Sequence, residues 1–107
     1  MHASVRRYRS SDTDALERKV EEEFIEKVKE VDGFVGYYVI DGGDGDVASV
    51  TVCKTADALA KITKLAGDWV RESASELVEG HPDVVAGEVR MRAEAYRVCR
   101  SLSMVAP

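Results

Sequence analysis

The sequence contains no asparagine and no glutamine, and it has only two histidines and two cysteines. The missing amides remove two side-chain types that many catalytic sites use. His2 and His81 are remote from each other and the carboxylates show no recognisable ligand spacing, so we expect no metal site. Cys53 and Cys99 form no C-x-x-C pair, and we expect both to be reduced and structural.

Long apolar runs and clusters of positive charge are also absent. No stretch of about 18 apolar residues is present and the N-terminal segment is charged and polar, which argues against a membrane span and a signal peptide. The formal net charge of −5 argues against a nucleic-acid surface. Dinucleotide- and phosphate-binding glycine motifs and a nucleophile elbow are missing. We expect a cytoplasmic protein that binds neither nucleic acid nor membrane and uses no cofactor.

The composition is that of one globular domain. The 107 residues are 45% hydrophobic and 33% charged, which is enough to bury a core without disulfides or metals. We expect residues 1–95 to form this domain. The last dozen residues, 96–107, carry apolar side chains without a clear period, and we expect a strand extension or a flexible tail there.

A β-hairpin is predicted between Gly33 and Cys53, where two apolar runs flank the turn 41–46, which is rich in glycine and aspartate. Alternation should place one set of the first run on one face, namely Phe34, Tyr38 and Ile40, and the other set on the opposite face, namely Val35, Tyr37 and Val39. The second run sets Val47 and Cys53 against Ala48, Val50 and Val52. Because both faces of the hairpin are apolar, both need cover.

Two amphipathic helices are predicted on either side of the hairpin. The first begins at the capping residues 11–14 and ends at Gly33, and its apolar stripe consists of Leu16, Val20, Phe24, Val28 and Val31. Glu23 and Lys27 should form an i,i+4 ion pair on its polar face. The second helix begins after Thr55 or Asp57 and runs to about Val78, where Gly80 and Pro82 end it.

Strands at residues 2–9 and 84–94 complete the pattern. In the second of these, small and apolar residues alternate with polar ones, which predicts a half-buried strand: Val85, Gly87, Val89, Met91 and Ala93. The order βαββαβ predicts an α+β, ferredoxin-like fold, with an antiparallel four-stranded sheet and both helices on one face. The other face stays apolar, which is rare on a soluble monomer, so we expect a homodimer with its sheets face to face.

The chain resembles the antibiotic biosynthesis monooxygenase-like proteins of the dimeric α/β-barrel superfamily in the segments GFVGYYVIDGGDGDVASVTVCKTADAL, AGDWVRESASEL and PDVVAGEVRM. The likeness spans roughly residues 2–93. It implies a ferredoxin-like subunit, a dimer in which two sheets form a barrel, and a pocket between sheet and helices in each subunit. Known activities in this family include cofactor-independent oxygenation of aromatic polyketides and haem degradation.

Haem degradation fits this chain poorly. The haem-degrading branch uses an asparagine, a tryptophan and a histidine together, and this chain has no asparagine. His81 also follows the predicted end of the helix that carries Trp69, so the two cannot share a helical face. No dedicated set of the polyketide branch can be matched residue by residue, which leaves the catalytic residues unassigned.

Aromatic residues supply the first candidates for a ligand-binding site. Trp69 offers a ligand a stacking face and an N–H donor, or it packs as ordinary core. Tyr37 and Tyr38 must face opposite ways, one toward the helices and one toward the dimer face. A phenol in a dry pocket donates to an oxyanion, although a buried tyrosine commonly does no more than satisfy its hydroxyl.

Arginines on neighbouring strands supply the second group. Arg6 and Tyr8 on the first strand could converge with Arg90 and Arg92 on the last strand and bind a carboxylate, phenolate or phosphate. Alternatively, these arginines lie on a solvated sheet edge beside glutamates. His81 could exchange protons at a pocket mouth, or it is an exposed loop residue.

Two functions remain as hypotheses. The first is a small-molecule pocket protein, a cofactor-independent monooxygenase that acts on a small aromatic or polyketide-like ligand. The second is a non-catalytic dimeric binding or interaction module whose pocket is filled by side chains. We prefer the first hypothesis and keep the second as the alternative, which the missing amides and the absence of a compact acid–base set favour.

Overall fold

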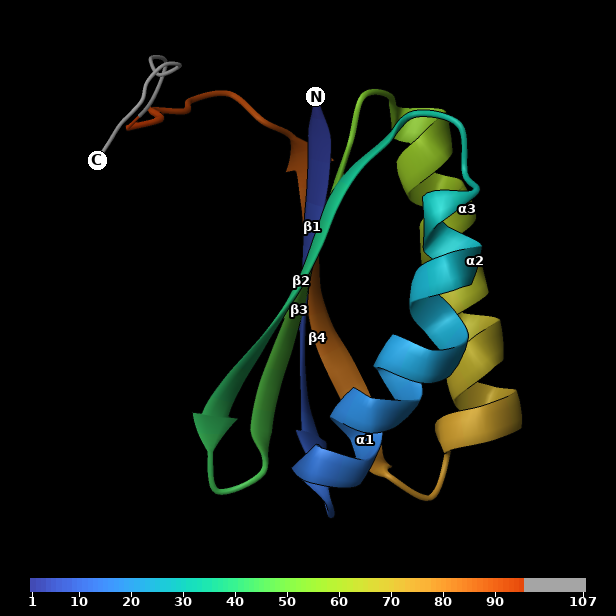
Figure 1. Cartoon of the computed structure of the whole chain (residues 1–107). Coiled ribbons are helices and arrows are strands. Elements are labelled where there is room, and N and C mark those ends of the chain that lie inside the picture. The colour runs from blue at the N-terminus through green and yellow to red at the C-terminus, as the bar shows by residue number, and fades with distance from the viewer. Residues whose placement is uncertain (96–107) are drawn as a thin grey trace.

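The computed structural model describes residues 1–95, so the expected extension or tail at 96–107, including Cys99, lies outside the described residues. The elements are β1 (His2–Ser10), α1 (Thr13–Lys19), η1 (Val20–Phe24), α2 (Ile25–Lys29), β2 (Phe34–Gly43), β3 (Asp46–Cys53), α3 (Ala56–Trp69), η2 (Val70–Ala74) and β4 (Val78–Glu88). The strands form one antiparallel sheet in the order β2-β3-β1-β4. Both helical segments lie on one side of it (Figure 1), which confirms the predicted ferredoxin-like α+β fold.

The first helical segment contains a wide π-helical turn, η1, between α1 and α2. Asp12 caps the N-terminus of α1, because its side chain accepts a hydrogen bond from the backbone N–H of Ala15 at 3.1 Å. Side chains spaced by four drift about 40° per step around an α-helix. The i→i+5 bonds of the wide turn offset that drift. As a result the predicted stripe is buried along its length, with Leu16, Val20, Phe24 and Val28 in the core.

The hairpin turn is shorter than predicted, because only Asp44 and Gly45 lie between β2 and β3. Both have positive φ, at 53° and 83°, which suits the two-residue turns that match strand twist. Gly45 packs tightly against the end of β1, where an added Cβ would lie 2.7 Å from the carbonyl oxygen of Ser10. A side chain at position 45 would therefore displace the turn.

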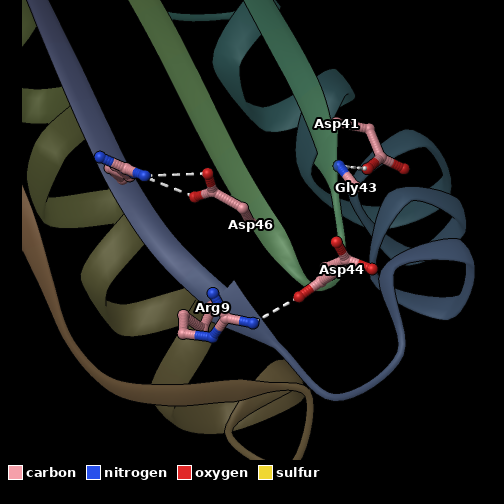
Figure 2. A network of polar contacts seen from close by, with 6 residues as sticks. Arg9, Asp41, Gly43, Asp44 and Asp46 are labelled. Atoms are coloured by element: carbon pink, nitrogen blue, oxygen red, sulfur yellow. Dashed lines mark hydrogen bonds and ion pairs between the residues drawn. The ribbon is translucent and has the colours of Figure 1, made fainter.

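Arginines of β1 hold this hairpin tip in place (Figure 2). Arg7 forms a bidentate ion pair with Asp46, with both N–O distances at 2.9 Å. Arg9 donates to the backbone carbonyl of Asp44. The Arg7 guanidinium lowers the pKa of the Asp46 carboxyl. Because these groups are exposed, we assign the network to register rather than to a large share of the stability.

A register irregularity in β2 overturns one predicted grouping. Phe34 pairs with Cys53 and Gly36 with Val52, so strict alternation is broken between them. Phe34 therefore packs toward the helices together with Tyr37 and Val39, and not on the face of Tyr38 and Ile40. The prediction that Tyr37 and Tyr38 face opposite ways is confirmed, because Tyr37 packs on the core and Tyr38 is exposed.

The boundary between the second helical segment and β4 was predicted wrongly. The segment begins at the Thr55 cap as expected, but it ends with η2 at Ala74. Strand β4 already begins at Val78 and ends at Glu88, not at 84 and 94. Gly80, with φ at 68°, and Pro82 looked like a helix stop. They lie instead in an irregular stretch of β4 whose pairing with Arg7 and Arg9 of β1 shifts register.

The sheet face that points away from the helices, here called the open face, is largely apolar. Its apolar residues are Ala3, Val5, Tyr38, Ile40, Ala48, Val50, Val52 and Val85. Toward the hairpin tip the same face carries charged residues, namely Arg7, Arg9, Asp46 and Asp83. Val85 is 76% exposed, so the strand that was predicted to be half-buried is uncovered on this face in the single subunit. An apolar sheet surface of this kind is unusual on a monomer.

Candidate functional site

A cavity of about 440 Å³ lies between the helix-facing side of the sheet and the helical segments. Its floor carries Ser4, Arg6 and Tyr8 from β1 and Ser49 and Thr51 from β3. Its walls are apolar and come from η1 and from the junction of α3 with η2. This polar floor between apolar walls is the form that small-molecule sites commonly take.

The floor results from strand alternation and register. Ser4 lies opposite Thr51 and Arg6 lies opposite Ser49, so these four side chains form two adjacent cross-strand pairs. Ser4, Ser49 and Thr51 are buried although they are polar. None of these three residues was predicted from the sequence as part of a site. The sequence did contain a sign of this polar floor. Ser49 and Thr51 share a strand face with Val47 and Cys53, where a packed core would favour apolar side chains.

Arg6 and two tyrosines make the floor suitable for an anion. Burial raises the pKa of Tyr8 to about 12, and it raises the pKa of Tyr37 as well. Arg6, Tyr8 and Tyr37 line the same cavity, and the positive charge of Arg6 lowers the pKa of both phenols, which partly offsets the effect of burial. Both tyrosines are therefore protonated donors beside a cation at neutral pH. Such a group can stabilise a phenolate, enolate or carboxylate.

Trp69 forms part of the wall and is only 5% exposed. Its ring packs on Phe24, with centroids 5.4 Å apart and planes tilted by 38°. Its Nε1–H donates to Oε1 of Glu23 at 3.2 Å, and Oε2 of Glu23 pairs with Lys19 at 3.3 Å. Trp69 thus packs in the core and also lines the cavity, and its N–H is already bonded to Glu23. Its contact with a ligand stays a prediction. The predicted Glu23–Lys27 ion pair is wrong, because Glu23 pairs with Lys19 instead.

Residues at the rim of the cavity are more exposed. His81 lies in β4 and lines the cavity, although it was expected to follow a helix stop. Arg71 of η2 also lines the cavity and forms an ion pair with Asp68. A histidine at this place can exchange protons with water and with a ligand at the opening.

Three of the predicted site residues lie elsewhere. Arg90 and Arg92 follow the end of β4 and line a separate, shallow depression beside Met1. Their nearest acidic partners are glutamates, at 3.9 Å for Arg90 and 3.8 Å for Arg92. The predicted convergence with Arg6 is wrong, because β4 ends before these arginines. Tyr38 is on the open face, away from the cavity floor.

The part of the chain that the structure describes contains no group of side chains suited to bind a metal ion. Within residues 1–95, no three histidine, cysteine, aspartate or glutamate side chains come together as a metal would require. Cys53 is buried, and burial raises the pKa of its thiol. Among the described helices, none has the length and apolar character needed to cross a membrane.

No protein-family model matches the sequence, and no curated protein is significantly similar to it. Solved structures do match the fold. The monooxygenase ActVA-Orf6 of Streptomyces coelicolor, in complex with nanaomycin D, has a TM-score of 0.71 at 18% identity, over 89% of this chain and 92% of that chain. SnoaB, a cofactor-independent oxygenase from Streptomyces nogalater, has a TM-score of 0.67 at 15% identity, over 85% and 94%.

A third structure comes from Nitrosomonas europaea and is a candidate antibiotic biosynthesis monooxygenase. It has a TM-score of 0.66 at 14% identity and covers 85% of this chain and 100% of that chain. Likeness at these identities establishes a common fold. The chain has the same ferredoxin-like fold as these oxygenase structures, which is the fold that its sequence resemblance implied.

Proposed function

We propose that the protein is a cofactor-independent monooxygenase that oxidises an aromatic, polyketide-like phenol in the cavity. The observation that carries this proposal is Arg6 beside the protonated phenols of Tyr8 and Tyr37, on the floor of a cavity with apolar walls. Two proteins with this fold, the monooxygenase and the cofactor-independent oxygenase from Streptomyces, support the reaction class.

The chemistry follows from stabilising a substrate anion. A phenol or enol bound with its oxygen at Arg6 loses its proton more easily, and its electron-rich anion can reduce O2 directly. For a ring methylene the balance is CH2 + O2 → C=O + H2O, so one oxygen atom enters the substrate and the other leaves in water. Tyr8 and Tyr37 donate to the anion, Phe24 and Trp69 flank the rings, and His81 exchanges protons at the rim.

The proposal includes a homodimer formed through the open face. Val5, Tyr38, Ile40 and Val85 are all at least two-fifths exposed and lie on the same side of the sheet. A second copy of the same face is a self-complementary cover. The alternative hypothesis of a pocket filled by side chains receives no support from the cavity volume of about 440 Å³.

The test uses 1,8-dihydroxyanthrone, a three-ring phenol with an oxidisable methylene. We expect metal-free protein to accelerate O2 consumption and quinone formation above the spontaneous rate in buffer. Arg6→Met should reduce kcat/KM by about a hundredfold, because a charge-assisted contact to the anion is lost. Arg18→Met, an exposed change on α1, is the matched control. Binding without oxidation would favour the non-catalytic binding module, and neither binding nor oxidation would remove this substrate class.

A further inference from the structure

One turn of the first helical segment holds Trp69 at two points. Glu23 and Phe24 are consecutive residues of η1. Phe24 packs against the indole ring with centroids 5.4 Å apart, while Oε1 of Glu23 accepts the indole N–H at 3.2 Å. Trp69 belongs to α3 and lines the cavity. Residues of η1 thus contact both its ring face and its N–H edge.

The hydrogen bond decides what Trp69 can offer a ligand. An indole has a single donor and no acceptor. Because that donor is directed to Glu23, Trp69 presents its ring to the cavity rather than a hydrogen-bonding group. The orientation of this wall therefore depends on a residue that does not itself line the cavity.

Charges around Glu23 favour its ionised form. Lys19 of α1 pairs with Oε2 at 3.3 Å, and Lys27 of α2 adds a further positive charge. The hydrogen bond from Trp69, followed by that from Lys19, lowers the pKa of the Glu23 carboxyl. A carboxylate makes a stronger acceptor for the indole N–H than a neutral group does.

We propose that Glu23 is a positioning residue of the cavity: by accepting the Nε1–H of Trp69, it holds the indole as a flat wall for an aromatic ligand. The part of this inference that concerns the ligand rests on the proposed function. The part that concerns the indole does not.

The single tryptophan makes the indole part directly measurable, because the protein has one indole N–H resonance. In wild-type protein this resonance should be protected from solvent exchange and should shift with pH, with a midpoint below 4.5. Glu23→Ala should remove the pH-dependent shift and speed the exchange of the indole N–H by about tenfold or more. Glu23→Gln keeps an acceptor, so it should keep the protection but lose the titration.

Glu22→Ala is the matched control, because Glu22 is an exposed glutamate in the same turn. It should leave the resonance, its exchange rate and its titration unchanged. An indole resonance that is also unchanged in Glu23→Ala would overturn the positioning role.

The ligand part is tested with 1,8-dihydroxyanthraquinone as the probe. Glu23→Ala should weaken its Kd by about tenfold, Glu23→Gln should restore most of the affinity, and Glu22→Ala should match wild type. Equal affinity in all four proteins would overturn the effect on the ligand. If wild type does not bind the probe but its indole resonance responds as described, the proposed function fails while Glu23 keeps its role toward Trp69.

Discussion

On the side of the sheet that the helices cover, β1 and β3 present Ser4, Arg6, Ser49 and Thr51, and on the other side they present Ala3, Val5, Val50 and Val52. A sheet with one covered face ordinarily buries its apolar side chains there and exposes the polar ones. Here the central part of the sheet has the reverse arrangement. The difference supports two proposals made above: that the cavity floor holds a polar group of a ligand, and that the open face contacts a second copy of the chain.

The largest effect is expected from placing a charge on the open face. Val85→Asp should convert the proposed dimer to a monomer of 11.8 kDa at micromolar concentration, because an unpaired carboxylate would be buried in the interface. Sedimentation velocity measures this. The dimer dissociation constant should rise by about a hundredfold or more.

Ala86→Asp is the control, since Ala86 is the next residue of β4, is also exposed, and points to the other face. It should leave the mass unchanged. Equal effects of the two substitutions, or a wild-type protein that is monomeric at this concentration, would contradict the proposed use of the open face.

An intermediate effect is expected from exchanging side chains between the two faces of β3. Thr51→Val replaces a hydroxyl on the cavity floor with a methyl group of similar size and should raise the free energy of unfolding by about 1 kcal/mol. Val50→Thr places a hydroxyl on the open face and should lower it by about the same amount when the protein is dimeric. Thermal unfolding should show shifts of about 4 °C in opposite directions. Shifts of the same sign would remove the functional distinction between the two faces.

The smallest effect concerns Tyr8 and is confined to alkaline pH. Its folded pKa of about 12 lies above the ordinary tyrosine value of 10.0, so the neutral form is favoured in the folded state. Stability from this group is complete below pH 10 and is lost as the pH rises toward 12. Burial raises the pKa of Tyr37 too, so ultraviolet titration should show a late phase to which both tyrosines contribute. Tyr8→Phe should reduce this late phase, and Tyr38→Phe, on the open face, should leave it unchanged. If Tyr38→Phe reduced the late phase instead, the late-ionising tyrosine would lie on the open face and the assignment to Tyr8 would be wrong.

Most of the architecture could be predicted from local patterns. The stripe from Leu16 to Val28 and the alternation in β3 are strong because burial on one side repeats along the element. The patterns failed where pairing between distant segments decides the outcome. Gly80 and Pro82 are typical of a helix stop, yet antiparallel pairing with β1 draws them into β4. The irregularity between Phe34 and Gly36 likewise depends on the register with β3.

The site was predicted in part. Five of the predicted residues line one cavity: Arg6, Tyr8, Tyr37, Trp69 and His81. Their spacing in the sequence did not indicate that they would come together. Their roles toward a ligand remain predictions. Arg90 and Arg92 were grouped with them only because β4 was expected to extend further. Glu23 was recognised as a helix-surface charge, but its partner across the fold, Trp69, is 46 positions away and could not be identified from the helical pattern.

The wide turns η1 and η2 have a consequence for how chains of this fold can vary in length. Each lies within a helical segment, and each contributes wall residues to the cavity, Phe24 from η1 and Val70 from η2. An i→i+5 turn holds one residue more than an i→i+4 turn. Loss of one residue from 20–24 or 70–74 would therefore give a regular α-helical turn and keep the flanking turns near their present phase, while it changes which side chains of that turn face the cavity. In relatives, a one-residue gap at either place would mark a reshaped cavity, even where the fold and the rest of the sequence are retained.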